Sequence, residues 1–140
     1  MNVASGVARW IGTQDLGSYS PDGVGGDLFV DTFPDQPDRA AMVTVNGGPD
    51  RPGWWGHGWT VATVQVLVRG DVDPRVSQRR ASAILEAFRA AAYITLTDSD
   101  GSRCRLVGTT PRQSHPVRVG PDDNRRHLHS LNVDLMIEPD

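Results

Sequence analysis

Apolar residues recur at helical spacing at two places in the chain. The first predicts a short amphipathic helix near the N-terminus, with an apolar face formed by Val3, Val7, Trp10 and Ile11. We expect this helix to end near Gly12 or Gly17, because glycine commonly follows the last turn of a helix. The residues from Gly17 to Asp27 are rich in Gly, Ser, Pro and Asp, and they predict a loop.

The second stretch predicts a long helix from Pro74 to Ala92, about 28 Å in length at the α-helical rise. Asp73 is a candidate N-cap, and Pro74 would occupy the first helical position, where the missing N–H costs nothing. The expected apolar stripe consists of Val76, Ile84, Leu85, Phe88, Ala91 and Ala92. We expect this helix to lie across a sheet and cover it.

Alternating apolar and polar positions predict strands around these helices. They are expected at residues 28–33, 40–46, 59–70 and about 127–137, with a hairpin within 93–111. The stretch from Asn46 to Gly58 is too rich in Gly and Pro for regular structure, so it predicts a long exposed loop. The order indicates one α+β domain over residues 1–140, with a mainly antiparallel sheet, a long helix packed on one face and a short N-terminal helix.

Length and charge exclude several classes of protein. A chain of 140 residues can bury a sizeable core, and its one cysteine, Cys104, cannot form an intramolecular disulfide. The formal net charge of −3 argues against nonspecific nucleic-acid binding by the whole surface. No export signal or membrane span is expected, so the sequence predicts a soluble protein of a reducing cytoplasm or of a particle assembled there.

The segment HPVRVGPDDNRRHLHSLNVDLMIE raises the question of a metal site. On a strand, His127 and His129 would point to the same side, roughly 7 Å apart, but Asp134 would face the opposite side. Only His57 and His115 remain as further histidines, which leaves few ligands, so structural or surface histidines are the preferred interpretation. A small metal-dependent or hydrolytic enzyme that uses His127, His129 and Asp134 is the alternative.

Three further motifs have structural interpretations. Residues 120–126, GPDDNRR, are turn formers, and adjacent aspartates in a turn diverge rather than act as an acid–base pair. The cluster RVSQRR at 75–80 is more typical of a solvated helix face than of DNA contact. Trp54 and Trp55 have two open explanations: a lid on the protein's own core, or an anchor for a protein partner.

Three segments of the chain together resemble the bacteriophage minor capsid or tail terminator (tail completion) family of long-tailed phages. They are GDLFVDTFPDQPDRAAMVTVNGG, TVQVLVRGDVDPRVSQRRASAILEAF and PVRVGPDDNRRHLHSLNVDLMIE, which cover Gly26–Glu138. Family features include a Pro-Asp-x-Pro-Asp turn, a strand reading Val-Gln-Val-x-Val-Arg-Gly, and a Gly-x-Asp-x-x-x-Arg turn before the last strand. The chain departs from the family pattern at Pro121, where a basic residue is usual, and in its Trp-rich loop.

The resemblance implies a structural virion protein rather than an enzyme, with no cofactor and no membrane partner. Members form a ring, usually hexameric, that caps the head-proximal end of the tail tube, stops tube polymerisation and joins the tail to the head connector. The implied partners are further copies of the chain, the tail tube protein and the head–tail connector protein, with genome DNA passing through the ring lumen. The protein would assemble in the host cytoplasm and reside in the virion tail. Candidate partner-interface residues are Trp54, Trp55, His57, Arg125 and Arg126.

Overall fold

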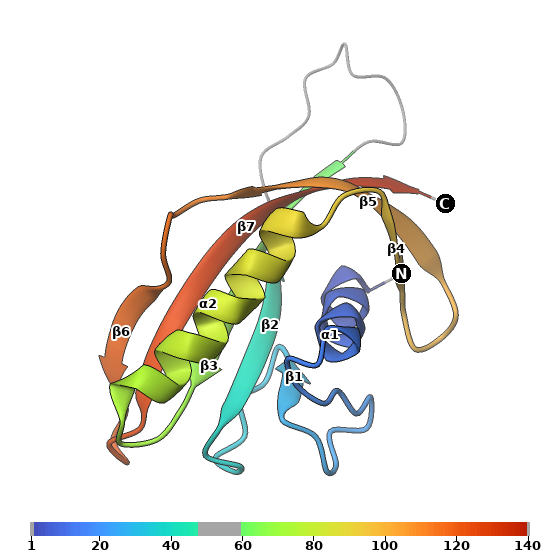
Figure 1. Cartoon of the computed structure of the whole chain (residues 1–140). Coiled ribbons are helices and arrows are strands. Elements are labelled where there is room, and N and C mark those ends of the chain that lie inside the picture. The colour runs from blue at the N-terminus through green and yellow to red at the C-terminus, as the bar shows by residue number, and fades with distance from the viewer. Residues whose placement is uncertain (1, 48–59, 140) are drawn as a thin grey trace.

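The computed structural model describes residues 2–47 and 60–139. Two helices and seven strands follow one another in this part of the chain (Figure 1). Their bounds are α1 Val3–Thr13, β1 Leu28–Val30, β2 Ala40–Asn46, β3 Thr60–Arg69, α2 Pro74–Ala90, β4 Ile94–Thr97, β5 Arg103–Pro111, β6 Val117–Pro121 and β7 His127–Pro139. The α+β class with a mainly antiparallel sheet is confirmed.

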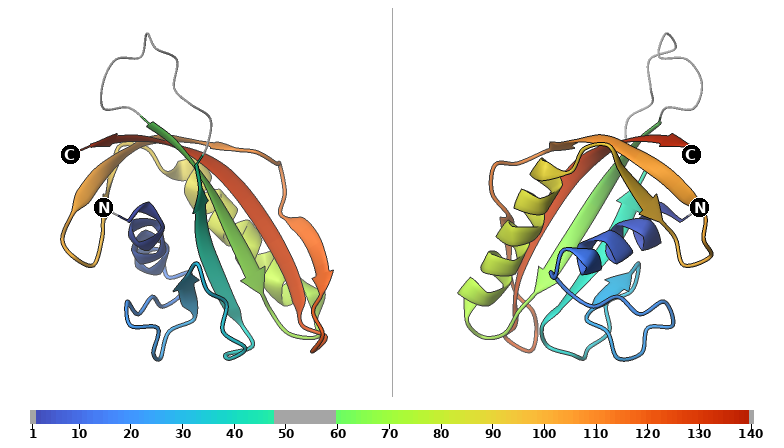
Figure 2. Two further views of the ribbon diagram at one scale, coloured as in Figure 1. Left: turned by 180° about the vertical axis from the view of Figure 1, so that it is seen from behind. Right: turned by 45° about the vertical axis from the view of Figure 1, so that its right-hand side comes forward.

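The described strands form one sheet in the order β1-β2-β3-β7-β5-β4, with β6 also paired to β7. All of its pairs are antiparallel except β1 with β2. Strand β7 is its centre, because β3 runs along one side and β5 and β6 divide the other. The sheet curves into an arch, and both helices lie on its concave side (Figures 1 and 2).

The concave face of the sheet carries the core. Its central residues, Val64, Val66, Leu131 and Val133, are fully buried, and the register places Val66 opposite Leu131 and Val64 opposite Val133. The intervening residues, such as Gln65 and Asn132, face the convex side and are partly exposed. The alternation therefore predicts correctly which face of β3 and β7 is buried.

Helix α1 is capped at its start by Asn2. The Asn2 side chain accepts a hydrogen bond from the Ser5 N–H at 3.1 Å, which satisfies one donor of the first turn. Val7, Ala8 and Ile11 are fully buried against the sheet. The helix ends at Thr13, close to the predicted Gly12.

Helix α2 is shorter than predicted. Asp73 caps its start by accepting the Arg75 N–H, as expected. The helix ends after 17 residues at Ala90, however, so the prediction of a long helix through Ala92 is wrong. Ala91 adopts an extended conformation and Tyr93 has a φ of 55°, because the chain turns there to enter β4. Ala91 is still buried, whereas Ala92 is exposed.

Two strand predictions also differ from the structure. The strand expected at 28–33 ends at Val30, because Asp31 adopts a φ of 60° that no strand accommodates. Strand β6 was not anticipated, since Gly120 and Pro121 read as part of a turn. The structure places them at the end of β6, beyond a register shift between Arg118 and Gly120, and the turn itself begins at Asp122.

Candidate assembly surface

Two buried arginines lie at the edge of the sheet where β3 ends and β7 begins. Arg69 is the last residue of β3 and is 4% exposed, and Arg126 directly precedes β7 and is 6% exposed. Charged side chains are seldom buried unless they are paired. We therefore describe the hydrogen-bond and ion-pair partners of these two guanidinium groups.

Arg69 binds the backbone of the loop between β1 and β2. Its Nη2 donates to the carbonyl oxygens of Pro34 and Pro37, each at 2.7 Å, and its Nε donates to that of Asp38 at 2.9 Å. The guanidinium carbon also lies 4.3 Å from the centre of the Phe33 ring. Burial, followed by the positive charge of Arg126, lowers the pKa of Arg69.

Arg126 ties the same loop to the turn before β7. Its Nη2 lies 2.8 Å from Asp35 Oδ1, its Nε 2.8 Å from Asp122 Oδ2, and its Nη1 3.3 Å from Asp38 Oδ1. Nη1 also donates to the Asp35 carbonyl oxygen. Asp122 in turn accepts the backbone N–H groups of Asn124 and Arg126, each at 2.9 Å. The two segments, far apart in sequence, are thus held as one surface.

We name the segments 31–38 and 121–126 the clamped surface. Its exposed charged residues are Asp31, Asp35, Asp38, Asp123 and Arg125. Arg125 has a φ of 62° and closes the turn, because its N–H donates to the Asp122 carbonyl oxygen at 3.0 Å. Of the predicted interface residues, Arg125 is therefore available to a partner, whereas the guanidinium of Arg126 is occupied within the chain. Trp54, Trp55 and His57 lie outside the described residues.

The two histidines of β7 do not meet the aspartate that an enzymatic or metal site would need. His129 faces the helices, and its Nδ1 lies 2.8 Å from Ser77 Oγ on α2. His127 Nδ1 is buried and has no hydrogen-bond partner in the described structure. Asp134 lies on the opposite face, where its carboxylate accepts from Thr63 Oγ1 at 2.7 Å and from Arg112 Nε at 3.0 Å. Within residues 2–47 and 60–139, no three potential metal ligands gather.

The buried position of His129 leads to a pH prediction. Burial, then the charges of Arg118 on β6 and His127 on β7, lower the pKa of His129 below its ordinary value of 6.5. The unfolded chain therefore binds this proton more readily than the folded one, so stability is present above about pH 6.5 and falls below it. We expect the urea midpoint of the wild type to fall between about pH 7.5 and pH 5.5, and that of His129→Gln to fall less. An equal fall in both proteins would assign the pH dependence to other groups.

A groove lined by arginines runs between α2 and the segment that follows α1. Arg39, Arg69, Arg79 and Arg80 contribute to its walls together with Asp15 and Asp27, and its volume is about 780 Å³. Arg80 crosses from α2 to this segment, since its Nε donates to the Leu16 carbonyl at 3.1 Å and its Nη2 lies 3.3 Å from Asp27 Oδ1. A Cβ on Gly17 would lie 2.5 Å from that Nη2 and 2.7 Å from Cγ of the buried Leu28, so a side chain there would have to displace both.

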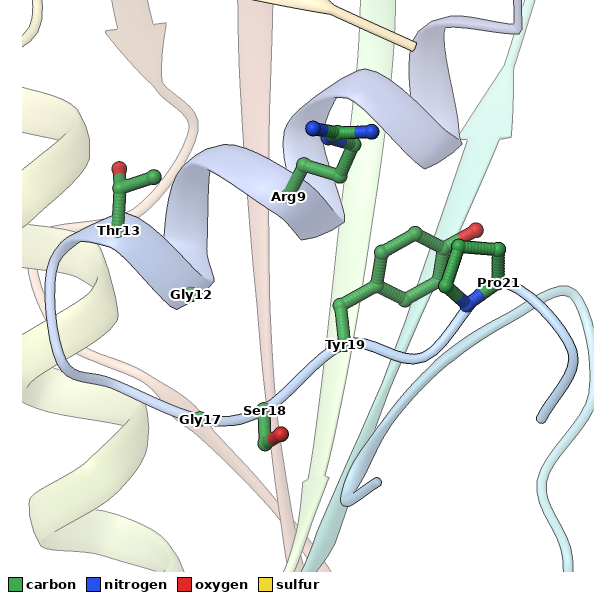
Figure 3. A pocket seen from close by; sticks show the side chains of 7 residues that line it. All are labelled: Arg9, Gly12, Thr13, Gly17, Ser18, Tyr19 and Pro21. Atoms are coloured by element: carbon green, nitrogen blue, oxygen red, sulfur yellow. The ribbon is translucent and has the colours of Figure 1, made fainter. Parts of the chain in front are cut away.

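A smaller pocket lies on the other side of the same segment. Figure 3 shows it between α1 and residues 17–21, with the Arg9 side chain extending from the helix and the Tyr19 ring beside Pro21. Its volume is about 450 Å³. The pocket and the arginine groove together have three exposed arginines in their walls: Arg9, Arg39 and Arg79. The cluster 75–80 is mostly a solvated face, because Arg75 and Arg79 are exposed, and only Arg80 is largely buried.

Comparisons with known proteins identify the family. The sequence profile of the family described as bacteriophage tail terminator protein matches residues 10–139. No protein of curated function matches significantly. One solved structure, of a protein without a functional name, is 18% identical over 81% of this chain and 82% of its own, with a TM-score of 0.43. No helix in the described ranges has the length and apolar character to cross a membrane. Because the profile spans nearly the whole sequence, the chain belongs to the bacteriophage tail terminator family, whose members are structural proteins of the phage tail.

Proposed function

We propose that this protein forms a hexameric ring that closes the head-proximal end of the phage tail tube. The observation that carries the proposal is the family match over residues 10–139. The fold is compatible with such a role, because the sheet presents a partly exposed convex face and the clamped surface presents fixed charges at one end. A closed ring requires a contact between two different surfaces of the same chain.

Termination then follows from occupancy of the growing end. One side of the ring docks on the last ring of tube subunits, and the other side offers no equivalent surface to a further tube subunit. That second side joins the head–tail connector protein, and genome DNA passes through the lumen. On this proposal the ring assembles in the host cytoplasm and remains in the virion.

The clamped surface is the candidate contact with one of these partners. Arg69 and Arg126 fix its backbone before any partner arrives, so little conformational entropy is lost there on binding. Arg125 is its exposed cation, and Trp54, Trp55 and His57, which lie outside the described residues, remain proposed contacts. On this proposal these residues bind a partner protein and do not catalyse a reaction.

Deletion of the gene from the phage tests the function directly. We expect electron microscopy of the lysate to show separate heads together with tails of uncontrolled length. Purified protein should appear as rings by electron microscopy and as a hexamer by native mass spectrometry, and its addition should restore joined particles. Joined particles with tails of normal length in the deletion lysate would contradict the proposal.

Replacement of Trp54 and Trp55 by alanine tests whether these two residues bind a partner protein. If the two indoles bind a partner, the melting temperature of the subunit should change little while attachment to tails or heads falls. If they instead cover the core, the subunit should lose several kcal/mol, since truncating a buried Trp costs about 3–5 kcal/mol. Thermal unfolding of the variant and microscopy of phage that encode it distinguish the two explanations.

A further inference from the structure

Two strands in the described structure leave one edge unpaired. Strand β6 pairs only with β7, and β4 pairs only with β5. The remaining outer strand, β1, is covered: Tyr19 forms a bridge with Leu28, and the Ser18 carbonyl accepts the Leu28 N–H at 3.0 Å. An open strand edge presents unpaired N–H and C=O groups to any extended chain that reaches it.

Apolar side chains are exposed at these same edges. On β6, Val117 is 48% exposed and Val119 is 57% exposed, and Tyr93, which directly precedes β4, is 74% exposed. These residues make up three of the five exposed large hydrophobic side chains in the part of the chain that the structure describes. Exposed apolar residues beside an open edge favour pairing with another strand.

The two open edges lie on opposite sides of the molecule. In Figure 1, β4 is at the right and β6 at the left, with both helices between them. The views of Figure 2 show the same separation. A contact that joins copies head to tail needs two different surfaces placed in this way.

The turn after β4 and strand β6 carry charges of opposite sign. The turn contains the buried Asp98 and the exposed Asp100, while Arg103 and Arg105 of β5 lie opposite Thr97 and Thr95 of β4. Strand β6 and the segment before it, residues 112–121, contain Arg112 and Arg118 and no acidic residue. Arg118 and Asp100 are exposed, and hydrogen bonds from Ser102 lower the pKa of Asp100 and keep it ionised. Attraction between these edges favours a neighbouring copy as the occupant.

We propose that β6 of one copy pairs along β4 of the next, so that the sheets of adjacent subunits are continuous around the ring. The inference rests on the proposed ring and adds the contact that closes it. Backbone hydrogen bonds would supply the pairing, Val117 and Val119 would be covered, and Arg118 would approach the acidic turn of the neighbouring copy.

Disulfide cross-linking tests the pairing. The double variants Thr97→Cys with Val119→Cys, and Thr97→Cys with Val117→Cys, place one thiol on each edge and cover an antiparallel and a parallel register that bring Arg118 near the acidic turn. Under mild oxidation, we expect at least one of them to give a ladder of covalent multimers that ends at the closed ring. The control Thr97→Cys with Val24→Cys uses a loop residue that is more exposed than either valine of β6, and it should give no ladder. Purified protein and tails from phage that encode the variants are both examined.

Charge reversal supplies an independent measurement. Arg118→Glu and Asp100→Arg should each raise the concentration for half-maximal ring formation by about fivefold or more. The double variant should recover most of that loss, because the two charges are then exchanged. Thermal unfolding of Arg118→Glu should match the wild type to within about 2 °C, since its side chain is exposed, whereas Asp100→Arg also loses the hydrogen bonds from Ser102 and should unfold at a somewhat lower temperature.

The outcomes separate this contact from the proposed function. Rings that form without the ladder and are indifferent to both reversals would overturn the edge pairing and leave the ring intact. Monomers at every concentration and in tails would overturn both. A cross-link from either edge to the tail tube protein, in place of a second copy, would assign that edge to another partner and also overturn the inference.

Discussion

Replacing Phe88 with alanine is expected to lower the free energy of unfolding by roughly 3–5 kcal/mol. Phe88 is fully buried on the inner face of α2, and its ring centroid lies 5.0 Å from that of Trp10 on α1. The substitution therefore removes the side chain that joins the two helices beneath the sheet, and it leaves a cavity. Urea unfolding monitored by circular dichroism measures the loss.

Arg79→Ala is the matched control on the same helix. The Arg79 side chain is exposed at the outer face of α2, so its loss should change stability by less than about 0.5 kcal/mol. Similar losses in the two variants would show that the packing of α2 differs from that described.

The substitution Arg69→Met is expected to cost roughly 2–4 kcal/mol. It keeps much of the buried volume but removes three hydrogen bonds from a charged donor to the backbone of residues 34–38. It also removes the charge that lies over the Phe33 ring. Besides the lower urea midpoint, the loop 31–38 should become more susceptible to limited proteolysis.

Arg39→Met provides the comparison for this second prediction. Arg39 pairs with Asp71 at 2.8 Å but is largely exposed, and an exposed ion pair contributes only about 0–1 kcal/mol. The proteolysis rate within 31–38 should stay close to that of the wild type. A variant of Arg69 no less stable than that of Arg39 would mean that the buried guanidinium does not hold the loop.

Patterns confined to neighbouring residues predicted most of the elements. The alternation from Val64 to Val68 identifies the buried face of β3, and Asp73 followed by Pro74 identifies the start of α2. The end of α2 could not be found in this way, because alanines 90–92 are all good helix formers. The chain stops there for a tertiary reason: the Tyr93 N–H bonds the Val107 carbonyl of β5 at 3.3 Å.

The candidate site was harder to predict, since its contacts join distant parts of the sequence. Arg126 was expected at a partner interface, yet the groups it holds include Asp35, which is 91 residues away. Nothing near Arg126 in sequence signals that pairing. Arg69 is the last residue of β3 and lies on the same side of the alternation as Gln65, where a charged side chain is typically exposed. Of the two arginines in the turn GPDDNRR, Arg125 is exposed and Arg126 is buried.

Arg69 holds its loop through hydrogen bonds to the backbone and not through the side chains that the loop exposes. Arg69 contacts the carbonyl oxygens of Pro34, Pro37 and Asp38, and a carbonyl oxygen is the same in every amino acid. An exposed side chain such as Thr32 can therefore be exchanged without loss of the Arg69 contacts that hold this path. If the clamped surface binds a partner as proposed, the exposed side chains that recognise this partner can change one at a time while the backbone keeps its path.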